Sequence, residues 1–199
     1  MSVPIVNNDR TLTTITSLCT DLRGFSELHE NLTPMVLADL LDVYYAETAA
    51  IVADAGGRVD TFLGDSVLAH FTTSPDDAAN AATRAVTAAL HMKAAIAQRW
   101  PTIAMSIGIA TGEAVVGHFG PASHRFHTAL GSVVSRAAAL ERRSHHSDFT
   151  VLMDRATRDQ LTGPFAITAH VRHGEKADRH EEMFAVRTAT ATSPKPLTS

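Results

Sequence analysis

A short turn between two strand-like runs constrains this chain more than any other feature. Arg58 to Phe62 and Val67 to Phe71 are the two runs, and the segment Leu63-Gly64-Asp65-Ser66 separates them. Glycine in the first central position suits a type II′ turn, which joins neighbouring antiparallel strands. Any fold assigned to the chain must therefore contain a β-hairpin at this point.

Two long runs with helical features flank the hairpin. The first follows Thr33-Pro34, an N-cap with proline at the first helical position, and extends to Ala55 with apolar residues at helical spacing. The second follows Ser74-Pro75-Asp76-Asp77, in which the same cap pattern is joined by carboxylates that favour a helix N-terminus, and it extends to about Arg99. We expect a helix in each run.

The other segments are mostly strand-like. A β-branched run from Thr11 predicts a strand that ends near Asp21. The run from Ile103 to Ile109 alternates, and we expect Thr111-Gly112 to turn the chain into a partner strand, Ala114 to Phe119, closed by Gly120-Pro121. The remaining expected elements are a helix capped by Ser132 to about Arg143, a strand at Phe149 to Leu152, a short helix capped by Asp154, and strands around Ala166 to Val171 and Met183 to Val186.

This order reads as βαββαββαβαββ. Adjacent hairpins with helices packed on one face predict an α+β domain with a mainly antiparallel sheet. The length of 199 residues favours one domain. We place it at residues 11–188, between an N-terminal lead at 1–10 and a disordered tail at 189–199 that contains two prolines and little apolar surface.

Composition narrows the environment and the partners. A single cysteine excludes a disulfide framework within the chain and favours a reducing compartment, so we expect a cytoplasmic location. No stretch reaches the roughly 18 apolar residues that a membrane span needs. The net charge is −4, with 17 basic and 21 acidic residues scattered along the chain, so the basic footprint of a nucleic-acid binder is missing. Small molecules or proteins are the expected partners.

Two carboxylates stand at strand ends, where backbone geometry fixes their direction. Asp21 ends the first strand and Asp65 lies in the hairpin turn. If the two strands are neighbours, both side chains point at one place, and with the carbonyl of Leu22 they form an oxygen site suited to Mg²⁺ or Mn²⁺. Such cations commonly arrive with a polyphosphate. The alternative is that one residue is a plain cap and the other a plain turn residue.

Four segments together resemble the catalytic domain of class III adenylate and guanylate cyclases. They are TDLRGFS, AGGRVDTFLGDSVLAHF, SIGIATGEAVVGHFG and HTALGSVVSRAAALE. Their order and spacing match over about Ile15 to Glu141, and a looser match continues to Val186. The resemblance implies a ferredoxin-like sandwich that works as a dimer, with nucleotide sites at the interface. It also implies conversion of a nucleoside triphosphate to a 3′,5′-cyclic monophosphate and pyrophosphate.

The resemblance assigns roles to several residues. Asp21 and Asp65 would bridge two metal ions that position an in-line attack on the α-phosphorus. The backbone from Leu22 to Phe25, around Gly24, would cradle the triphosphate with its N–H groups. Thr128 occupies a position that reads the purine, where threonine suits adenine, so ATP is the expected substrate.

Three positions depart from the family pattern. Thr61 stands where active members carry a purine-binding lysine. Ser135 replaces the asparagine that orients the ribose, and Ala139 replaces the arginine that stabilises the transition state. A missing phosphate-directed arginine costs about 10³ to 10⁵ in rate, and one missing polar donor costs about 10² to 10³. The sequence therefore predicts a degenerate cyclase with very low or no activity.

Two substitutes for missing groups stay open. Arg136 precedes Ala139 by three positions on the same helix and could reach the phosphate, or it could be a solvated surface arginine. In the late hairpin Lys176 is the candidate for the triphosphate lysine, and His173 competes with it. His118, His124 and His127 fall in the segment that resembles the dimerisation arm of the family. Three interpretations stay open for them: metal ligands, pH sensors or plain surface or interface residues. Their spacing matches no zinc template.

The leading hypothesis is thus a homodimeric cyclase domain that keeps the metal half of its site. A second hypothesis is a non-catalytic metal- or nucleotide-binding module that pairs with an active cyclase domain, which would supply the missing lysine, asparagine and arginine. A diguanylate cyclase is a third and weaker option, because Gly64-Asp65-Ser66 does not match its GGDEF-like turn.

Overall fold

The computed structural model describes residues 9–25, 30–73, 79–171 and 182–188. The succession of helices and strands has the predicted form βαββαββαβαββ, although two of the predicted strands are one strand here and the strand Phe126–Leu130 was not predicted. In chain order they are β1 (Thr11–Arg23), α2 (Pro34–Asp54), β2 (Arg58–Leu63), β3 (Ser66–Thr72), α3 (Ala81–Arg99), β4 (Ala104–Phe119), β5 (Phe126–Leu130), α4 (Ser132–His145), β6 (Val151–Asp154), α5 (Arg155–Gln160), β7 (Phe165–Val171) and β8 (Glu182–Thr188).

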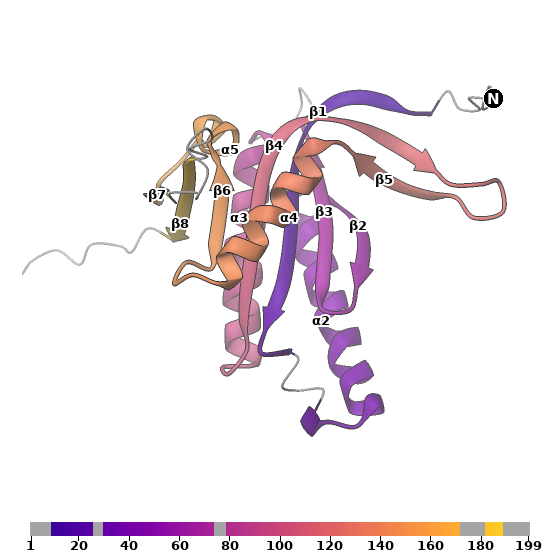
Figure 1. The fold of residues 1–199 in the computed structure, drawn as a ribbon, viewed down its shortest axis with the longest axis vertical. Coiled ribbons are helices and arrows are strands. Elements are labelled where there is room, and N and C mark those ends of the chain that lie inside the picture. Colours follow the sequence, from indigo (N-terminus) through magenta and orange to yellow (C-terminus); the bar gives the residue numbers. More distant parts are fainter. Residues whose placement is uncertain (1–8, 26–29, 74–78, 172–181, 189–199) are drawn as a thin grey trace, which may run out of the picture.

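The strands form one sheet with β1 near its middle (Figure 1). Along the sheet the order is β2-β3-β1-β4-β6-β8-β7, and β5 pairs with β4 off this path. The β4–β6 pair is parallel, and the other pairs are antiparallel. The prediction of an α+β domain with a mainly antiparallel sheet is confirmed.

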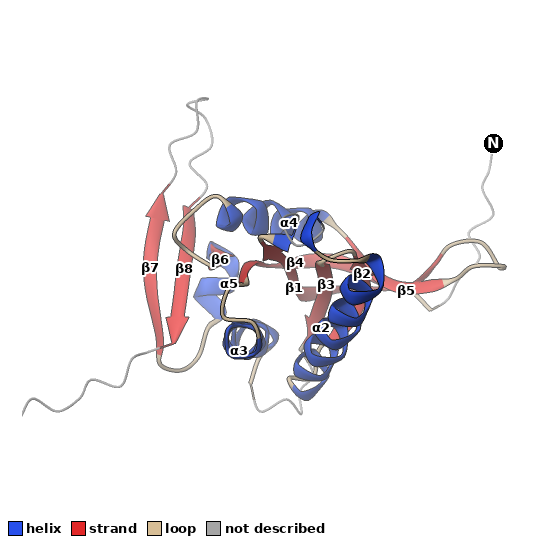
Figure 2. Ribbon diagram, turned by 90° about the horizontal axis from the view of Figure 1, so that it is seen from below, coloured by secondary structure: helices blue, strands red, loops and turns tan. Residues whose placement is uncertain are grey.

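Helices cover both faces of the sheet, so the expectation that they share one face is wrong. Figure 2 shows α2 and α3 on one side and α4 on the other. The reason is the alternation of side chains along β1, because Leu18 and Leu22 join the core under α2 and α3 whereas Ile15 joins the core under α4. Both faces of this central strand are apolar, and each needs a helix to cover it.

Helix α4 lies directly on β4 because Gly108 lacks a side chain. A Cβ at Gly108 would lie 2.1 Å from the carbonyl oxygen of Ala137 and 2.2 Å from the backbone nitrogen of Glu141. A neighbouring backbone cannot move aside as a flexible side chain can. The glycine therefore sets the distance between helix and strand, and with it the position of Glu141 over the sheet.

The second hairpin differs from the sequence prediction. Strand β4 continues through Thr111-Gly112 without a turn, because β1 pairs with it along its whole length, from Thr11 opposite Val116 to Arg23 opposite Ala104. The chain reverses after Gly120, which has φ +102°, and returns as β5, a strand that the sequence reading missed. Together the outer part of β4 and β5 form an arm that extends from the body (Figure 1).

Smaller differences concern helix ends. Helix α3 begins at Ala81 after Asn80, whose side chain accepts a 2.9 Å hydrogen bond from the backbone N–H of Thr83, and the predicted cap at 74–77 lies outside the described residues. Helix α4 follows Gly131 and has no side-chain cap, so Ser132 is its first residue. The expected strand at Phe149 starts two residues later, at Val151. The caps at Thr33 and Asp154 are confirmed.

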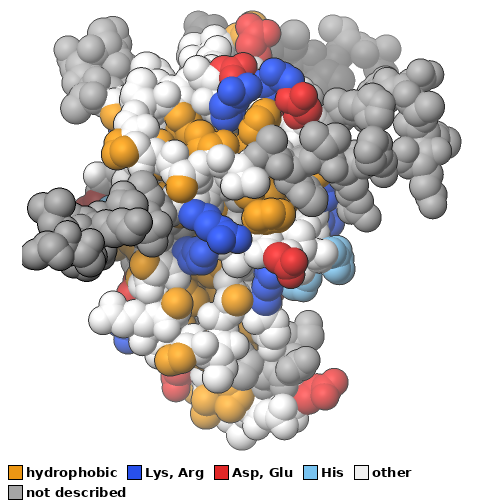
Figure 3. Space-filling model, turned by 90° about the vertical axis from the view of Figure 1, so that its left-hand side faces the viewer, with side chains coloured by type: hydrophobic (Ala, Val, Ile, Leu, Met, Phe, Trp, Pro, Cys, Tyr) orange, Lys and Arg blue, Asp and Glu red, His pale blue; other side chains and the backbone are white. Residues whose placement is uncertain are grey.

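Two broader observations concern the surface. Within the described ranges, no helix combines the length and the apolar character needed to cross a membrane. On the side of the molecule that carries β7 and β8, basic, acidic and apolar side chains are interspersed (Figure 3). The proposed lead and tail fall largely outside the described residues, since 1–8 and 189–199 are not described.

Candidate functional site

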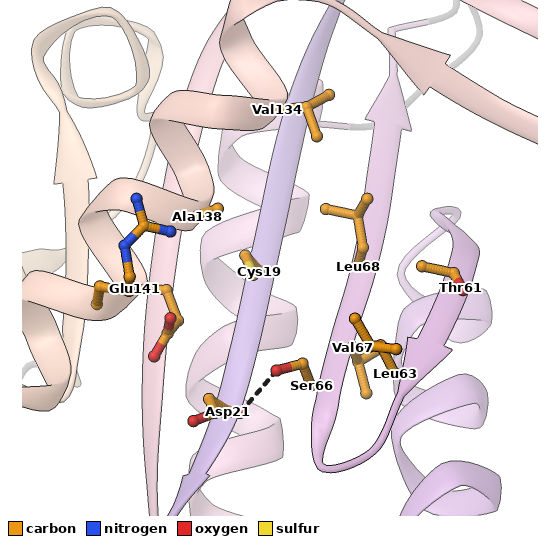
Figure 4. A pocket seen from close by; sticks show the side chains of 11 residues that line it. Cys19, Asp21, Thr61, Leu63, Ser66, Val67, Leu68, Val134, Ala138 and Glu141 are labelled. Carbon is orange, nitrogen blue, oxygen red and sulfur yellow. Dashed lines mark hydrogen bonds between the residues drawn. The ribbon is translucent and has the colours of Figure 1, made fainter.

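Asp21 lies near the end of β1, opposite Ser106 of β4. The hydroxyl of Ser66, the first residue of β3, donates a 2.7 Å hydrogen bond to Oδ1 of Asp21 (Figure 4). This bond ties the end of β1 to the hairpin turn, because β1 and β3 are antiparallel neighbours in the sheet. A shared carboxylate site was expected only if the strands are neighbours, and β1 and β3 meet that condition.

Asp65 occupies the tip of that turn. Leu63 pairs with Ser66 across it, and Gly64 has φ +58°, as the first central position of a type II′ turn requires. The hydroxyl of Tyr45 on α2 donates to the carbonyl of Gly64, which anchors the turn to the helix. The loop that carries Asp65 is therefore held from two directions.

The two carboxylates interact. Burial raises the pKa of Asp65 above its ordinary value, and the neighbouring charge of Asp21 raises it further. Backbone N–H groups of Asp65 and Leu22 act in the opposite direction, since they stabilise the ionised form. Asp21 and Asp65 are thus close enough to interact, and the backbone N–H of Leu22 contacts the carboxylate of Asp65.

Two further residues join this cluster that the sequence analysis did not assign. Glu141 and His145 extend from α4, and ligand atoms of Asp21, Glu141 and His145 all lie within 4.8 Å of one another. Burial, followed by the charge of Asp21, raises the pKa of Glu141 to about 7. One oxygen of Glu141 is buried and has no hydrogen-bond partner. The only sequence signal was that Glu141 closes the last of the four cyclase-like segments.

A pocket of about 440 Å³ opens between α4 and the β1–β3 part of the sheet. Asp21, Ser66 and Glu141 lie at one end, and the rest of the wall is mainly apolar, as at Leu68 and Val134 (Figure 4). Thr61 and Arg142 are polar members of that wall. Cys19 lies between the acidic end and the apolar part of the wall, and burial raises the pKa of its thiol to about 12. The thiol is therefore protonated at neutral pH and is a poor nucleophile.

The donor set fits a hard divalent cation. Carboxylate and carbonyl oxygens are the ligands that Mg²⁺ and Mn²⁺ prefer. Burial first, and then the neighbouring charge of Asp21, raises the pKa values of Asp65 and Glu141, and a bound cation would offset both effects. Asp21, Asp65 and the Leu22 carbonyl would hold such a cation, and Glu141 and His145 lie next to it.

The other predicted residues surround this pocket to different degrees. Thr61 on β2 lines it. Ser135 and Ala139 lie one turn apart on α4, beside the lining residues Val134 and Ala138, but they do not line the pocket themselves. Thr128 is buried in β5 with 7% of its surface exposed, and it is not part of the lining.

At the end of β1, Gly24 has φ +84° and Phe25 is buried, so the chain turns there as a phosphate-binding backbone loop would require. Lys176 and His173 lie outside the described residues.

Arg136 is engaged away from the pocket. Its guanidinium donates to the carbonyl of Thr111 at 2.9 Å, to Ser132 at 3.3 Å and to Asp154 at 3.4 Å. To take the role of an arginine at position 139, its side chain would have to leave all three contacts. The geometry therefore favours the structural interpretation of Arg136 over the catalytic one.

These features agree with the comparisons to known proteins. The chain matches the model of the adenylate and guanylate cyclase catalytic domain over residues 8–186, and it belongs to that family. The crystal structure of the adenylyl cyclase CyaB from P. aeruginosa superposes with a TM-score of 0.80 at 26% identity, covering 92% of this chain and 98% of that one. The fold and the family are thus those that the four sequence segments indicated.

Two curated relatives are considerably longer than this chain. An adenylate cyclase of Anabaena cylindrica is 26% identical over 162 residues, which cover 75% of this chain and 31% of that protein. The terminal-differentiation-specific adenylate cyclase of Dictyostelium discoideum is 28% identical over 153 residues, which cover 74% of this chain and 7% of that protein. This chain therefore spans less than a third of either relative.

Proposed function

We propose that the chain binds ATP together with Mg²⁺ or Mn²⁺ and converts it to 3′,5′-cyclic AMP and pyrophosphate at a very low rate or not at all. The observation that carries the proposal is the meeting of Asp21 and Asp65 beside the Leu22 backbone, while Thr61, Ser135 and Ala139 stand where base-, ribose- and phosphate-directed groups are expected. Relatives named adenylate cyclase support the choice of ATP.

The residues present suit the metal-binding half of the site. Divalent cations bound at the carboxylates would lower the pKa of the ribose 3′-hydroxyl and neutralise phosphate charge. Asp21 and Asp65 would hold those cations against the triphosphate, and the Ser66 hydroxyl fixes the orientation of Asp21. The turn at Gly24 allows backbone N–H groups to approach the phosphates. In the reaction the 3′-oxygen bonds to the α-phosphorus, the bond to the β-phosphate breaks, and the hydroxyl proton leaves to solvent.

The other half of the site, which would bind the base and stabilise the transition state, lacks its expected groups. Thr61 is too short to reach a purine as a lysine does, and Ala139 carries no charge to stabilise the transition state. Losses of this kind multiply to several orders of magnitude in rate. We place this function ahead of the non-catalytic interaction module because the family model that matches the chain is that of a catalytic domain, and relatives of the chain are named adenylate cyclases.

The assembly and location of the chain belong to the same proposal. We infer a homodimer. The base-reading positions on β2 and β5 and the phosphate-directed position on α4 of one protomer would be completed by the metal-binding carboxylates of another. An active cyclase domain as the second protomer is the alternative. A cytoplasmic location is consistent with a single, partly buried cysteine that has no disulfide partner within the chain.

The experiment measures cyclic AMP and cyclic GMP formed by the purified chain with Mn²⁺ and either ATP or GTP. We expect cyclic AMP at a turnover at least about 100-fold below one per second, and its loss in Asp21→Asn. Turnover near one per second in the wild type would reject the degenerate site. Product formation that is unchanged in Asp21→Asn would reject the assignment of the metal carboxylates.

A further inference from the structure

A second cluster of metal-ligating side chains lies outside the pocket described above. It comprises Asp60 on β2, His70 on β3 and His127 on β5, and ligand atoms of all three lie within 4.8 Å of one another. We propose that these three residues form a binding site for a transition-metal dication of the Zn²⁺ class. The proposal does not depend on the nucleotide chemistry.

A β-bulge brings the carboxylate to the histidine. Val59 pairs with Ala69 and Thr61 pairs with Leu68, so Asp60 is an extra residue with no partner of its own across the β2–β3 ladder. Bulges redirect side chains in this way. As a result, Oδ1 of Asp60 lies 2.8 Å from Nδ1 of His70, and both side chains are at least 95% buried.

The third ligand comes from the arm. His127 of β5 stacks on His70 with ring centroids 5.9 Å apart. It is paired in the sheet with His118 of β4, whose ring meets it edge-on at 5.1 Å and whose Nδ1 is held by Asp9 at 2.8 Å. Three different strands thus direct side chains to one place, which is the arrangement that a rigid metal site requires.

Two atoms of the cluster lack partners. The second carboxylate oxygen of Asp60 and Nδ1 of His127 are both buried, and neither makes a hydrogen bond. Buried polar atoms are almost always satisfied, so such orphans indicate a missing partner. Because the two atoms belong to neighbouring residues of the same cluster, one cation can satisfy both.

The donor atoms suit a transition-metal dication. Two imidazoles with one carboxylate form a donor set of the Zn²⁺ class rather than the all-oxygen set that Mg²⁺ or Ca²⁺ prefers.

The geometry needs only small adjustments. Around a tetrahedral Zn²⁺ the ligand atoms lie about 3.3 Å apart, since each is about 2.0 to 2.2 Å from the ion. Because the three ligand atoms lie within 4.8 Å of one another, their separations need to shorten by at most about 1.5 Å. His118 lies beside the site, and either it or a water would take the fourth position.

The position of the site gives it a structural consequence. Asp60 precedes Thr61 and His127 precedes Thr128, so two ligands adjoin both positions that the sequence assigned to purine reading. A cation held between them would fix β2 to β5 at the base of the arm. The site would thus act as a clamp that sets the distance between those two threonines.

The test titrates the full chain, purified without a histidine tag and stripped with a chelator, with Zn²⁺ in excess Mg²⁺ at pH 7.5. We expect one tightly bound Zn²⁺ and, with Co²⁺ in its place, the intense visible absorption of a tetrahedral ion. At a free Zn²⁺ concentration about 100-fold above Kd, the Tm should rise by about 5 to 10 °C.

Variants separate this site from its alternatives. His127 is partly exposed, so His127→Gln should fold normally and weaken Zn²⁺ binding at least tenfold, as should Asp60→Asn. His91→Gln, at an exposed histidine of α3, is the matched control and should bind Zn²⁺ as the wild type does. Asp21→Asn, which disables the other cluster, should also retain the tight Zn²⁺.

Three results would overturn the proposal. In the first, the wild type binds Zn²⁺ no more tightly than His127→Gln does. In the second, Asp21→Asn abolishes Zn²⁺ binding and His127→Gln retains it. In the third, the Co²⁺ spectrum is weak, as is typical of octahedral oxygen ligands.

Discussion

The hydroxyl of Ser66 donates a 2.7 Å hydrogen bond to the carboxylate of Asp21, across 45 positions of sequence. The bond occupies one oxygen of Asp21 and leaves the other, Oδ2, facing His145 at 3.8 Å. Because Ser66 directly follows Asp65, the same residue that orients one carboxylate also ends the turn that presents the other. The strand end and the hairpin turn therefore act as one unit.

Substitutions in this unit should weaken ATP binding in a definite order. In Mn²⁺, Asp21→Asn and Asp65→Asn should each raise the Kd for ATP by about 100-fold or more, because each removes a charged ligand. Ser66→Ala should raise it by only about 3- to 10-fold, the value of one hydrogen bond that orients a ligand. Isothermal titration calorimetry measures all three.

The control for this series is Asp39→Asn, at an exposed carboxylate of α2, which should leave the Kd unchanged. Equal affinities in Asp39→Asn and Asp21→Asn would mean that Asp21 takes no part in nucleotide binding.

Restoring the missing side chains should raise the rate. The triple variant Thr61→Lys, Ser135→Asn and Ala139→Arg returns the groups that active family members carry, and a phosphate-directed arginine alone contributes about 10³ to 10⁵. We expect cyclic AMP formation in Mn²⁺ to increase at least 100-fold over the wild type. The added Asp21→Asn change should remove that gain. A triple variant that folds and binds ATP yet stays inert would show that these three positions were misassigned.

Much of the fold was readable because local patterns and the final structure agree. Thr33-Pro34 does start α2, Asp154 does cap α5, and the turn at Gly64 has the positive φ that its sequence implied. In each case a short segment determines its own conformation. The match to the cyclase family also rested on local segments, which were read in order along the chain.

The errors arose where a distant element decides the outcome. Thr111-Gly112 looks like a turn, but pairing with β1 keeps the strand extended through it. The absence of a side chain at Gly112 instead leaves room for the guanidinium of Arg136, whose Nη2 lies 2.8 Å from the place that a Cβ would occupy. The sequence cannot distinguish a glycine that turns the chain from one that makes room for a neighbour.

The site was predicted in the same uneven way. Asp21 and Asp65 were proposed from the sequence because one ends a strand and the other lies in a hairpin turn. Glu141 and His145 were not proposed, because only the packing of α4 on β4 brings them to Asp21. The three histidines of the arm were noted but not assigned. Asp60 and His70 complete the group around His127 only after the β2–β3 bulge and the β4–β5 pairing are known.

The contact at Gly108 predicts a large effect from a small change. Gly108→Ala places a methyl group against backbone atoms of Ala137 and Glu141, so α4 must shift and the free energy of unfolding should fall by about 3 kcal/mol or more. ATP affinity should fall with it, because α4 carries Glu141. Urea unfolding followed by circular dichroism measures the stability.

Gly112→Ala is the matched control on the same strand. Its methyl group meets Nη2 of Arg136 rather than backbone, and a shift of that side chain weakens its hydrogen bond to Thr111. The loss of stability should therefore be about 1.5 kcal/mol or less. A loss in Gly108→Ala as small as in Gly112→Ala would contradict the close approach of α4 to β4.

The raised pKa of Glu141 predicts how the free energy of unfolding depends on pH in the absence of metal. Its pKa is raised from 4.5 to about 7 in the folded chain, so between these values the folded form holds a proton that the unfolded form has lost. The folded state then binds more protons, and this group's contribution to the free energy of unfolding falls as pH rises from about 4.5 to 7. In EDTA, the wild type should therefore lose about 1 to 3 kcal/mol relative to Glu141→Gln over that range.

The comparison with metal present completes this prediction. Mn²⁺ favours ionised carboxylates, so it should reduce the decline of the wild type between pH 4.5 and 7 and leave Glu141→Gln less affected. Glu113→Gln, at an exposed glutamate of β4, should follow the wild type in both conditions. If wild type and Glu141→Gln lose stability in parallel across the range in EDTA, the charge on Glu141 is not disfavoured by its burial beside Asp21.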